Sequence, residues 1–238
     1  MQTAQVKLSV PHQQVFQDNF NYLSSQIVGH QVDLNEEIGY LNQIVFNSLA
    51  TTSPLDVAAS WSVYRLLLNV CRLGLSLDPE KKLAYVIPSL TETGEKIMKL
   101  YPGYRGEIAI ASNANVLKNA NAVLVYENDH FRIQAATGEI EHFVTSLSID
   151  PRVRGACSGG YCRSVLMDGS VLMSYLSIEE MDSIAQHQIE ANMGNTPWNS
   201  IWRTEMNRVA LYRRAAKDWR QLIKATPEMQ SSLLDTEF

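Results

Sequence analysis

The sequence predicts an α+β fold, in which a small antiparallel sheet with hairpins is flanked by helices and a long basic amphipathic helix lies near the C-terminus. Three observations carry this prediction. Apolar residues recur at helical spacing up to residue 74, and helix signals return after residue 177. The stretch between breaks into short strands bounded by turn residues, and bases gather on one side of residues 201–224.

The N-terminal part of the chain predicts two helices. Over residues 34–50, apolar side chains recur every three to four residues. For the second helix, Ser53 is a candidate N-cap, Pro54 takes the first helical position and Gly74 follows the last turn.

The middle of the chain predicts strands instead. Residues 83–87 form a short strand that Pro88 stops. Residues 121–126 and 130–134 predict two strands joined across residues 127–129. Residues 163–167 and 170–176 flank an Asp-Gly pair, which is suited to a type I′ hairpin turn.

Helix signals return after this hairpin. Ser177 and Glu180 form a capping box, so a helix is predicted to run to about Ala191. Thr196 and Pro197 then open the last long helix.

On a helical wheel, residues 201–224 have two distinct faces, an apolar arc of about 160° and a cationic arc of about 120°. The cationic arc contains Arg203, Arg213, Arg214, Lys217, Arg220 and Lys224. It is either a solvated face paired with acids elsewhere or a track for a phosphate backbone. Arg208 falls within the apolar arc, where an unpaired charge is costly, so it is expected to have a carboxylate partner or to reach a ligand.

The overall charge hides an uneven distribution. A net charge of -5 and a pI of about 5.6 argue mildly against a nucleic-acid partner. However, residues 1–60 hold one base against five acids, whereas residues 198–224 hold seven bases against two acids. An acidic protein can therefore present a local cationic surface.

The sequence lacks the signatures of several function classes. There is no P-loop, no GxGxxG, no HExxH and no GxSxG nucleophile motif, so no catalytic residue, metal or cofactor is predicted. No apolar run is long enough to span a membrane, and no signal peptide is expected. The three cysteines have no CxxC spacing and are expected to be free thiols in a reducing cytoplasm. Adjacent carboxylates leave a two-metal nuclease as a minor alternative.

Four segments combine into a more specific pattern. They are 73–79 (LGLSLDP) with 84–88 (AYVIP), 102–111 (PGYRGEIAIA), 125–131 (VYENDHF), and 173–217, which runs from Met173 through Trp202 to a basic helix. In this order and spacing they resemble the RecT family of phage-type single-strand DNA annealing proteins, over more than half of the chain.

The resemblance implies a protein that binds single-stranded DNA and anneals it into duplex without ATP or any other cofactor, in homologous recombination and repair. It implies a homo-oligomer, either a ring or a helical filament, in the cytoplasm of a bacterial host. It also implies a 5′→3′ exonuclease as partner. A passive protein that coats single strands without annealing them is the alternative, because both need a cationic groove and self-association.

The resemblance and the charge pattern together nominate the DNA-contacting residues. They are Tyr104, Arg105, Lys118, Arg152, Arg154, Trp202, Arg203, Arg208, Arg213, Arg214 and Lys217. Tyr104 offers a stacking face and Arg105 a bidentate contact for phosphate. The alternative is an ordinary strand-to-helix turn in which Arg105 pairs with a carboxylate. Trp202 could stack on bases or, with Trp198, anchor the start of the helix. A groove joining the Tyr104–Arg105 turn, the middle sheet and the last helix is expected.

Two departures from the family pattern remove positive charge. Ser112 and Asn113 stand where the family usually has bases, and Val209 stands where a lysine is common. Lys118 is expected to compensate.

The pattern predicts three regions. Residues 1–60 form a helical segment assigned to protomer contacts, and residues 61–224 form the DNA-binding and annealing core. Residues 225–238 carry acids without bases, which predicts a flexible tail. That tail is either a docking element for a host single-strand-binding protein or the exonuclease, or merely a disordered terminus.

Overall fold

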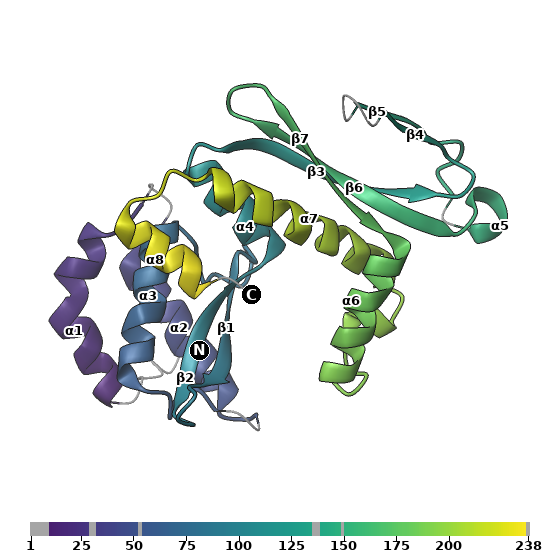
Figure 1. Cartoon of the computed structure of the whole chain (residues 1–238). Coiled ribbons are helices and arrows are strands. Elements are labelled where there is room, and N and C mark those ends of the chain that lie inside the picture. Colours follow the sequence, from purple (N-terminus) through teal and green to yellow (C-terminus); the bar gives the residue numbers. More distant parts are fainter. Residues whose placement is uncertain (1–9, 29–31, 52–53, 135–138, 149, 237–238) are drawn as a thin grey trace, which may run out of the picture. The chain divides into compact units, whose positions relative to one another are not determined.

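The computed structural model describes residues 10–28, 32–51, 54–134, 139–148 and 150–236, and divides into two compact units. The first unit comprises Met1–Ala114 and Ile223–Phe238, and the second comprises Asn115–Leu222. The predicted α+β class is confirmed, because helices and small antiparallel sheets make up both units (Figure 1).

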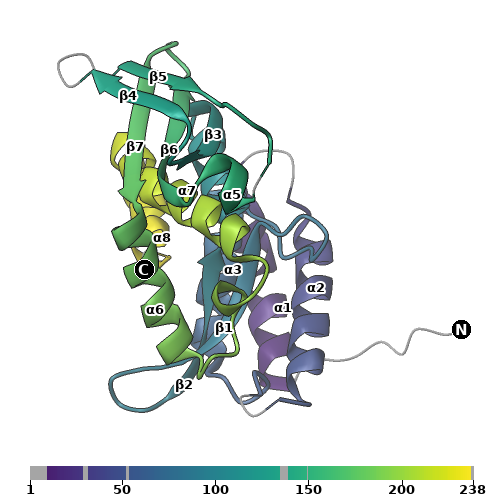
Figure 2. The ribbon, with the colours of Figure 1, turned by 90° about the vertical axis from the view of Figure 1, so that its right-hand side faces the viewer.

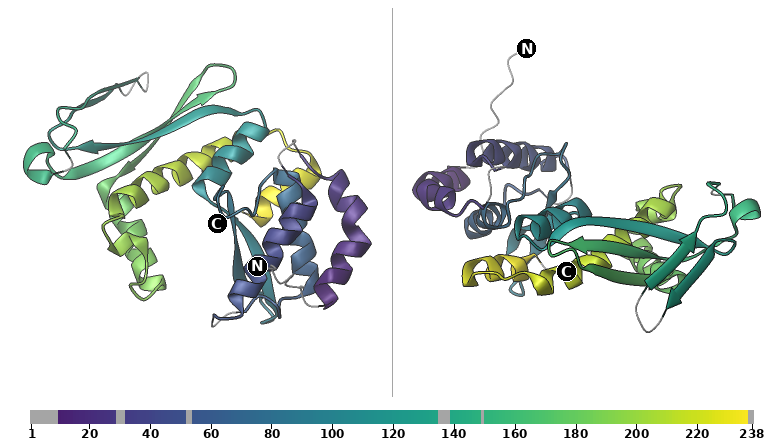
Figure 3. Two further views of the ribbon diagram at one scale, coloured as in Figure 1. Left: turned by 180° about the vertical axis from the view of Figure 1, so that it is seen from behind. Right: turned by 90° about the horizontal axis from the view of Figure 1, so that it is seen from above.

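The first unit packs helices against a two-stranded sheet. Its elements are α1 (Val10–Ser25), α2 (Leu34–Ser48), α3 (Ser60–Leu73), β1 (Ala84–Leu90), β2 (Lys96–Pro102), α4 (Tyr104–Asn113) and α8 (Pro227–Asp235). The central element is α3, which packs against α1, α8 and β2 and buries most of its residues (Figure 3).

Local chemistry sets the helix ends in this unit. The Asp33 side chain accepts hydrogen bonds from the first turn of α2, and Gly74 ends α3 in the left-handed conformation at φ +61°. However, α3 begins at Ser60 rather than at Pro54. The preceding segment forms a turn instead, in which Ser48 Oγ accepts from the Leu55 amide and His12 Nε2 donates to the Ala58 carbonyl.

The prediction that Pro88 stops the first strand was wrong. Strand β1 runs through Pro88, which pairs with Met98 of β2. Because the sheet has only two strands, one side of β1 has no strand partner, and an amide can be missing there without breaking a ladder.

The glycine at 106 allows α4 to pack against the loop that precedes β1. A Cβ at this position would overlap the Leu83 carbonyl oxygen. The space beside Gly106 is therefore filled by the chain's own backbone.

Gly106→Ala is accordingly expected to destabilise the first unit by about 1–3 kcal/mol through overpacking. Gly39→Ala in α2 is the matched control, because nothing lies within 4 Å of its added methyl. It is expected to stabilise the helix by up to about 1 kcal/mol. Urea denaturation of both variants measures the difference, and equal stabilities would contradict this packing.

The second unit is a three-stranded antiparallel sheet with a helix on one face. Its elements are β3 (Leu117–Tyr126), β4 (His130–Gln134), β5 (Glu139–Phe143), α5 (Pro151–Arg154), β6 (Cys157–Leu166), β7 (Val171–Ser177), α6 (Ile178–Ala191), the 3-10 turn η1 (Pro197–Asn199) and α7 (Arg203–Leu222). The strand order is β3-β6-β7, and β4 and β5 form a separate hairpin. Helix α7 covers one face of the three strands, and the hairpin lies over the other (Figures 1 and 2).

The two strands predicted on either side of residues 127–129 are confirmed as β3 and β4, which pair with β6 and β5 and not with each other. Two other local predictions about this unit need correction. The β6–β7 hairpin is confirmed, but its turn is not type I′, since Asp168 has a negative φ and Gly169 has φ +86°. Thr196 caps η1, and the long helix begins only at Arg203. The capping box of Ser177 and Glu180 at the start of α6 is confirmed.

The segment predicted as a flexible acidic tail contains helix α8 over Pro227–Asp235. Thr226 caps this helix, Leu233 is buried, and Asp235 forms an ion pair with Arg65 of α3. Further contacts with α3, such as the hydrogen bond from Arg72 Nη1 to the Glu228 carbonyl, also hold this segment. None of the described helices is long and apolar enough to cross a membrane.

Candidate nucleic-acid interface

The buried face of α7 is fixed to the three-stranded sheet by polar as well as apolar contacts. Trp219 is almost fully buried, and its indole Nε1 donates to Ser164 Oγ of β6 at 2.9 Å. Ser174 Oγ of β7 donates to Asp218 at 2.7 Å. Asp218 therefore helps to fix α7 to the sheet.

Leu211 of α7 packs closely against Gly160 of β6. A Cβ there would lie 2.6 Å from the Val123 carbonyl oxygen and 2.8 Å from Leu211 Cδ1. Only glycine leaves room for the helix at this distance. The rotation of α7 about its own axis is thus set by packing, and its opposite face is held toward solvent.

The second half of α7 presents bases on that opposite face. Arg214 and Lys217 are exposed, and neither has a carboxylate partner among the residues that the structure describes. Arg213 and Arg220 lie beside them and are half-buried. From Arg213 to Arg220 the helix rises about 10 Å. We call Arg213, Arg214, Lys217 and Arg220 the cationic row. Arg220 was absent from the nominated contacts, although its spacing of three from Lys217 identifies it.

The bases in the first half of α7 are already paired. Arg203 Nη2 donates to Asp182 of α6 at 2.6 Å, and its guanidinium lies 5.5 Å from the centre of the Trp198 ring. Arg208 forms an ion pair with Glu205, so the prediction that it has a carboxylate partner is confirmed. Arg203 ties the start of α7 to α6, whereas the Arg208–Glu205 pair lies within α7, and the positive charge of both arginines is locally neutralised.

The two tryptophans before α7 have different surroundings. Trp198 is buried beneath Arg203, as expected for an anchor of the helix start. Trp202 is 60% exposed and offers an open ring face. Only Trp202 is therefore available to stack on a base in this conformation.

Tyr104 and Arg105 form the first turn of α4, directly after β2, with Gly103 as the N-cap. Arg105 is exposed, and its Nε donates to the Tyr104 hydroxyl at 3.3 Å. Tyr104 and Arg105 thus lie in a strand-to-helix turn, as one of the two interpretations of the sequence predicts. However, no carboxylate pairs with Arg105 among the described residues, so its guanidinium is accessible to an anion.

Lys118 lies at an irregularity in β3. The register shifts between Leu117 and Asn119, so Lys118 has no direct partner on β6. Its side chain is exposed. A bulge changes the direction of the side chains beside it. Lys118 therefore departs from the regular alternation of side chains between the two faces of the sheet.

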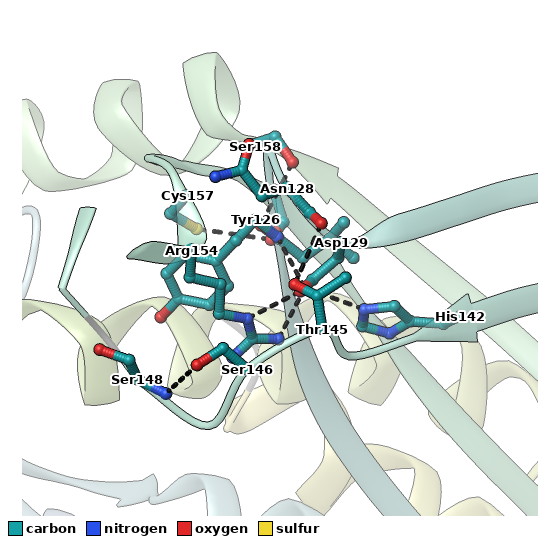
Figure 4. Close-up of polar contacts among 12 residues, drawn as sticks. Tyr126, Asn128, Asp129, His142, Thr145, Ser146, Ser148, Arg154, Cys157 and Ser158 are labelled. Carbon is teal, nitrogen blue, oxygen red and sulfur yellow. Dashed lines mark hydrogen bonds and ion pairs between the residues drawn. The ribbon is translucent and has the colours of Figure 1, made fainter. Parts of the chain in front are cut away.

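Arg154, which the sequence nominates as a DNA contact, is buried. Its Nε and Nη2 donate to the two oxygens of Asp129 at 2.8 and 2.6 Å, and the guanidinium lies 4.2 Å from the centre of the Tyr126 ring (Figure 4). His142 Nε2 also lies 3.1 Å from Asp129 Oδ2. Asp129 and His142 are almost completely buried, so these three residues form a buried charge cluster.

The buried charge cluster holds the Asp129 carboxyl in its ionised form. Hydrogen bonds from Arg154, and to a lesser extent from His142 and the Tyr126 amide, keep the pKa of Asp129 well below its usual range despite burial. The cluster joins the β3–β4 turn, β5 and α5, and His142 Nδ1 lies 3.2 Å from the Tyr161 hydroxyl of β6. The VYEND motif therefore has a structural role in this unit.

Arg152 lies two residues from Arg154 in the same one-turn helix but is 90% exposed on its side chain. It pairs with Asp150, the N-cap of α5, at 2.6 Å. The same helix thus turns one arginine inward and the other outward.

The nominated residues are divided between the two units. Tyr104 and Arg105 belong to the first unit, whereas the other nominated residues belong to the second. Within the second unit, α7 brings the members of the cationic row together, while Arg154 is withdrawn into the core. The groove expected to join both units remains a prediction. Across the described ranges, no group of His, Cys, Asp and Glu side chains could hold a metal ion.

The profile of the RecT family matches residues 42–226, which is well over half of the chain. No curated protein matches it.

Proposed function

The chain belongs to the RecT family, and on that premise we propose that it anneals complementary single strands of DNA as a homo-oligomer, without ATP. Family membership supports a role in phage-type recombination through single-strand annealing. Two parts of the proposal go beyond family membership. They are the assembly into a ring or a helical filament and the independence from ATP.

The cationic row of α7 is the observation that carries this proposal. Arg214 and Lys217 are exposed bases on a helix whose other face is fixed to a sheet, so their positions are preorganised. Phosphate contacts of this kind carry no sequence information, which suits a protein that must accept any strand. Trp202 and Tyr104 supply aromatic faces for bases, and Arg105 supplies a further phosphate contact.

Annealing requires no energy source because pairing of complementary strands is itself favourable. The protein lowers the barrier in two ways. Displacement of counterions from the phosphates relieves the repulsion between two strands. Holding a strand along a row of bases also reduces the conformational entropy that pairing must overcome.

Other parts of the chain have proposed roles in assembly. The acidic, helical residues 1–60 are proposed to contact neighbouring protomers, so that cationic rows continue from one copy to the next. Partners are proposed to be a 5′→3′ exonuclease that exposes the strand and a host single-strand-binding protein. The site of action is then the cytoplasm of a bacterial host.

Annealing of two complementary, fluorescently labelled oligonucleotides tests this function. The strands are mixed with and without the protein, in the absence of nucleotide, and duplex formation is followed with time. We expect faster annealing with the protein and weaker acceleration as salt rises.

The same experiment separates the alternatives. Binding of the strands without faster annealing would favour a passive coat. Shortening of the DNA on a denaturing gel when Mg²⁺ is added would favour a nuclease. An absence of binding at low salt would contradict the proposal.

A further inference from the structure

A cavity of about 270 Å³ lies in the first unit between α3, β2 and the end of α8. It is smaller than the pockets of about 300–1,000 Å³ that hold whole small-molecule ligands, which suits a few side chains of a peptide. We propose that this cavity is a docking site for a segment of a partner protein that carries a carboxylate beside an apolar side chain.

The floor of the cavity is apolar. Leu66 of α3 and Met98 and Leu100 of β2 are almost fully buried and line it from below. Burial of one leucine-sized side chain against such a floor contributes favourably to binding. An apolar side chain is therefore the first requirement for the occupant.

The rim of the cavity is cationic and aromatic. Trp61 and Arg65 lie one turn apart on α3 and are both partly exposed, and Lys99 is exposed on β2. Trp61 Nε1 donates to Glu95 at 3.1 Å, which orients the indole ring. Of the ionisable residues that line the cavity, Arg65 pairs with Asp235, whereas Lys99 has no ion-pair partner among the residues that the structure describes. A carboxylate is the second requirement.

The protein's own helix α8 already shows this mode of contact. Asp235 accepts hydrogen bonds from Nε and Nη2 of Arg65, and Asn69 Nδ2 lies 3.5 Å from the same carboxylate. Its neighbour Leu234 lines the cavity and is 60% exposed. The carboxylate of an incoming acidic and apolar segment would pair with Lys99 in the way that Asp235 pairs with Arg65. It would also compete with Asp235 for Arg65.

Fluorescence anisotropy of a short fluorescein-labelled peptide of alternating leucine and aspartate tests the proposal on the full chain. We expect the peptide to bind, and its twin with asparagine in place of aspartate to bind at least about tenfold more weakly, since a charge-assisted hydrogen bond is lost. Lys99→Glu is expected to weaken binding similarly. Lys96→Glu is the matched control, since Lys96 is an exposed lysine of the same strand outside the cavity, and it is expected to keep the affinity.

A variant in which the two charges are exchanged distinguishes loss of peptide recognition from loss of the fold. The double variant Arg65→Asp/Asp235→Arg keeps an ion pair between α3 and α8 but reverses its direction. It is expected to lose affinity for the aspartate peptide and to bind the corresponding leucine–arginine peptide more tightly than the unmodified protein does.

Three results would overturn the inference. They are equal binding of the aspartate and asparagine peptides, equal loss in the Lys96→Glu and Lys99→Glu variants, and an unchanged preference in the charge swap. Displacement of the peptide by a single-stranded oligonucleotide would show that the peptide binds to a DNA-binding surface. This result would also overturn the inference.

Discussion

The double variant Arg214→Glu/Lys217→Glu is expected to lose annealing, with at least about a 100-fold drop in affinity for single-stranded DNA, because two charge-assisted phosphate contacts become repulsive. Both side chains are exposed on α7, and neither contributes to the contacts that fix this helix to the sheet. The fold should therefore persist, with an unchanged circular dichroism spectrum and thermal midpoint. The rate of annealing at low salt is the measurement.

A control with the same change in net charge isolates the position of these charges. Lys81 and Lys96 are exposed lysines of the first unit, and Lys81→Glu/Lys96→Glu alters the net charge equally. This variant is expected to anneal at close to the normal rate. Equal loss in both double variants would mean that overall charge, and not the cationic row, governs binding.

Arg154→Met is expected to destabilise the second unit by about 3–5 kcal/mol, because it leaves the buried Asp129 carboxylate without its main partner. The measurement is urea denaturation at neutral pH. Arg152→Met is the matched control, since the same substitution is made two residues away on an exposed side chain. It is expected to leave the denaturation midpoint nearly unchanged.

The pH dependence of this difference follows from the pKa of Asp129. Because Arg154 lowers the pKa of Asp129 below its ordinary 3.8 in the folded state, the ion pair stabilises the fold fully above about pH 5. This contribution is lost as the pH falls through 3.8 and below, where the unfolded chain takes up the proton first. The destabilisation by Arg154→Met should therefore shrink in acid. A difference that stays constant from pH 7 to pH 3 would contradict the role of the ionised carboxylate.

Features that depend on neighbouring residues were predictable from the sequence. The capping box of Ser177 and Glu180 satisfies backbone amides within one turn, so its pattern is local and α6 begins where expected. The two faces of α7 follow from helical periodicity, and Trp219 and Leu211 are buried as the wheel requires. Even the partner of Arg208 lies only three residues away, at Glu205.

Features that depend on distant partners were not predictable. No residue near Arg154 in the sequence indicates that Arg154 pairs in the core with Asp129, which lies 25 residues earlier. The pairing of β3 with β6 rather than with β4 likewise joins segments separated by α5 and the β4–β5 hairpin. Helix α8 is too short for periodicity to identify, and its anchor, Arg65, lies 170 residues away in sequence.

The same distinction applies to the candidate interface. A list of bases in the sequence treats Arg154, Arg203 and Arg214 alike, because each carries the same charge. The structure separates them by their surroundings, since Arg154 is buried, Arg203 is paired with Asp182, and Arg214 is exposed. The cationic row is therefore a smaller and more specific set than the sequence alone provides.

The salt dependence of single-stranded DNA affinity tests the central claim most directly, with the unmodified protein compared to Arg214→Gln/Lys217→Gln. If both side chains contact phosphates, the slope of log K against log salt should become shallower by about 1.4, which is about 0.7 for each lost contact. An unchanged slope in the double variant would show that the DNA lies elsewhere and would contradict the assignment of α7.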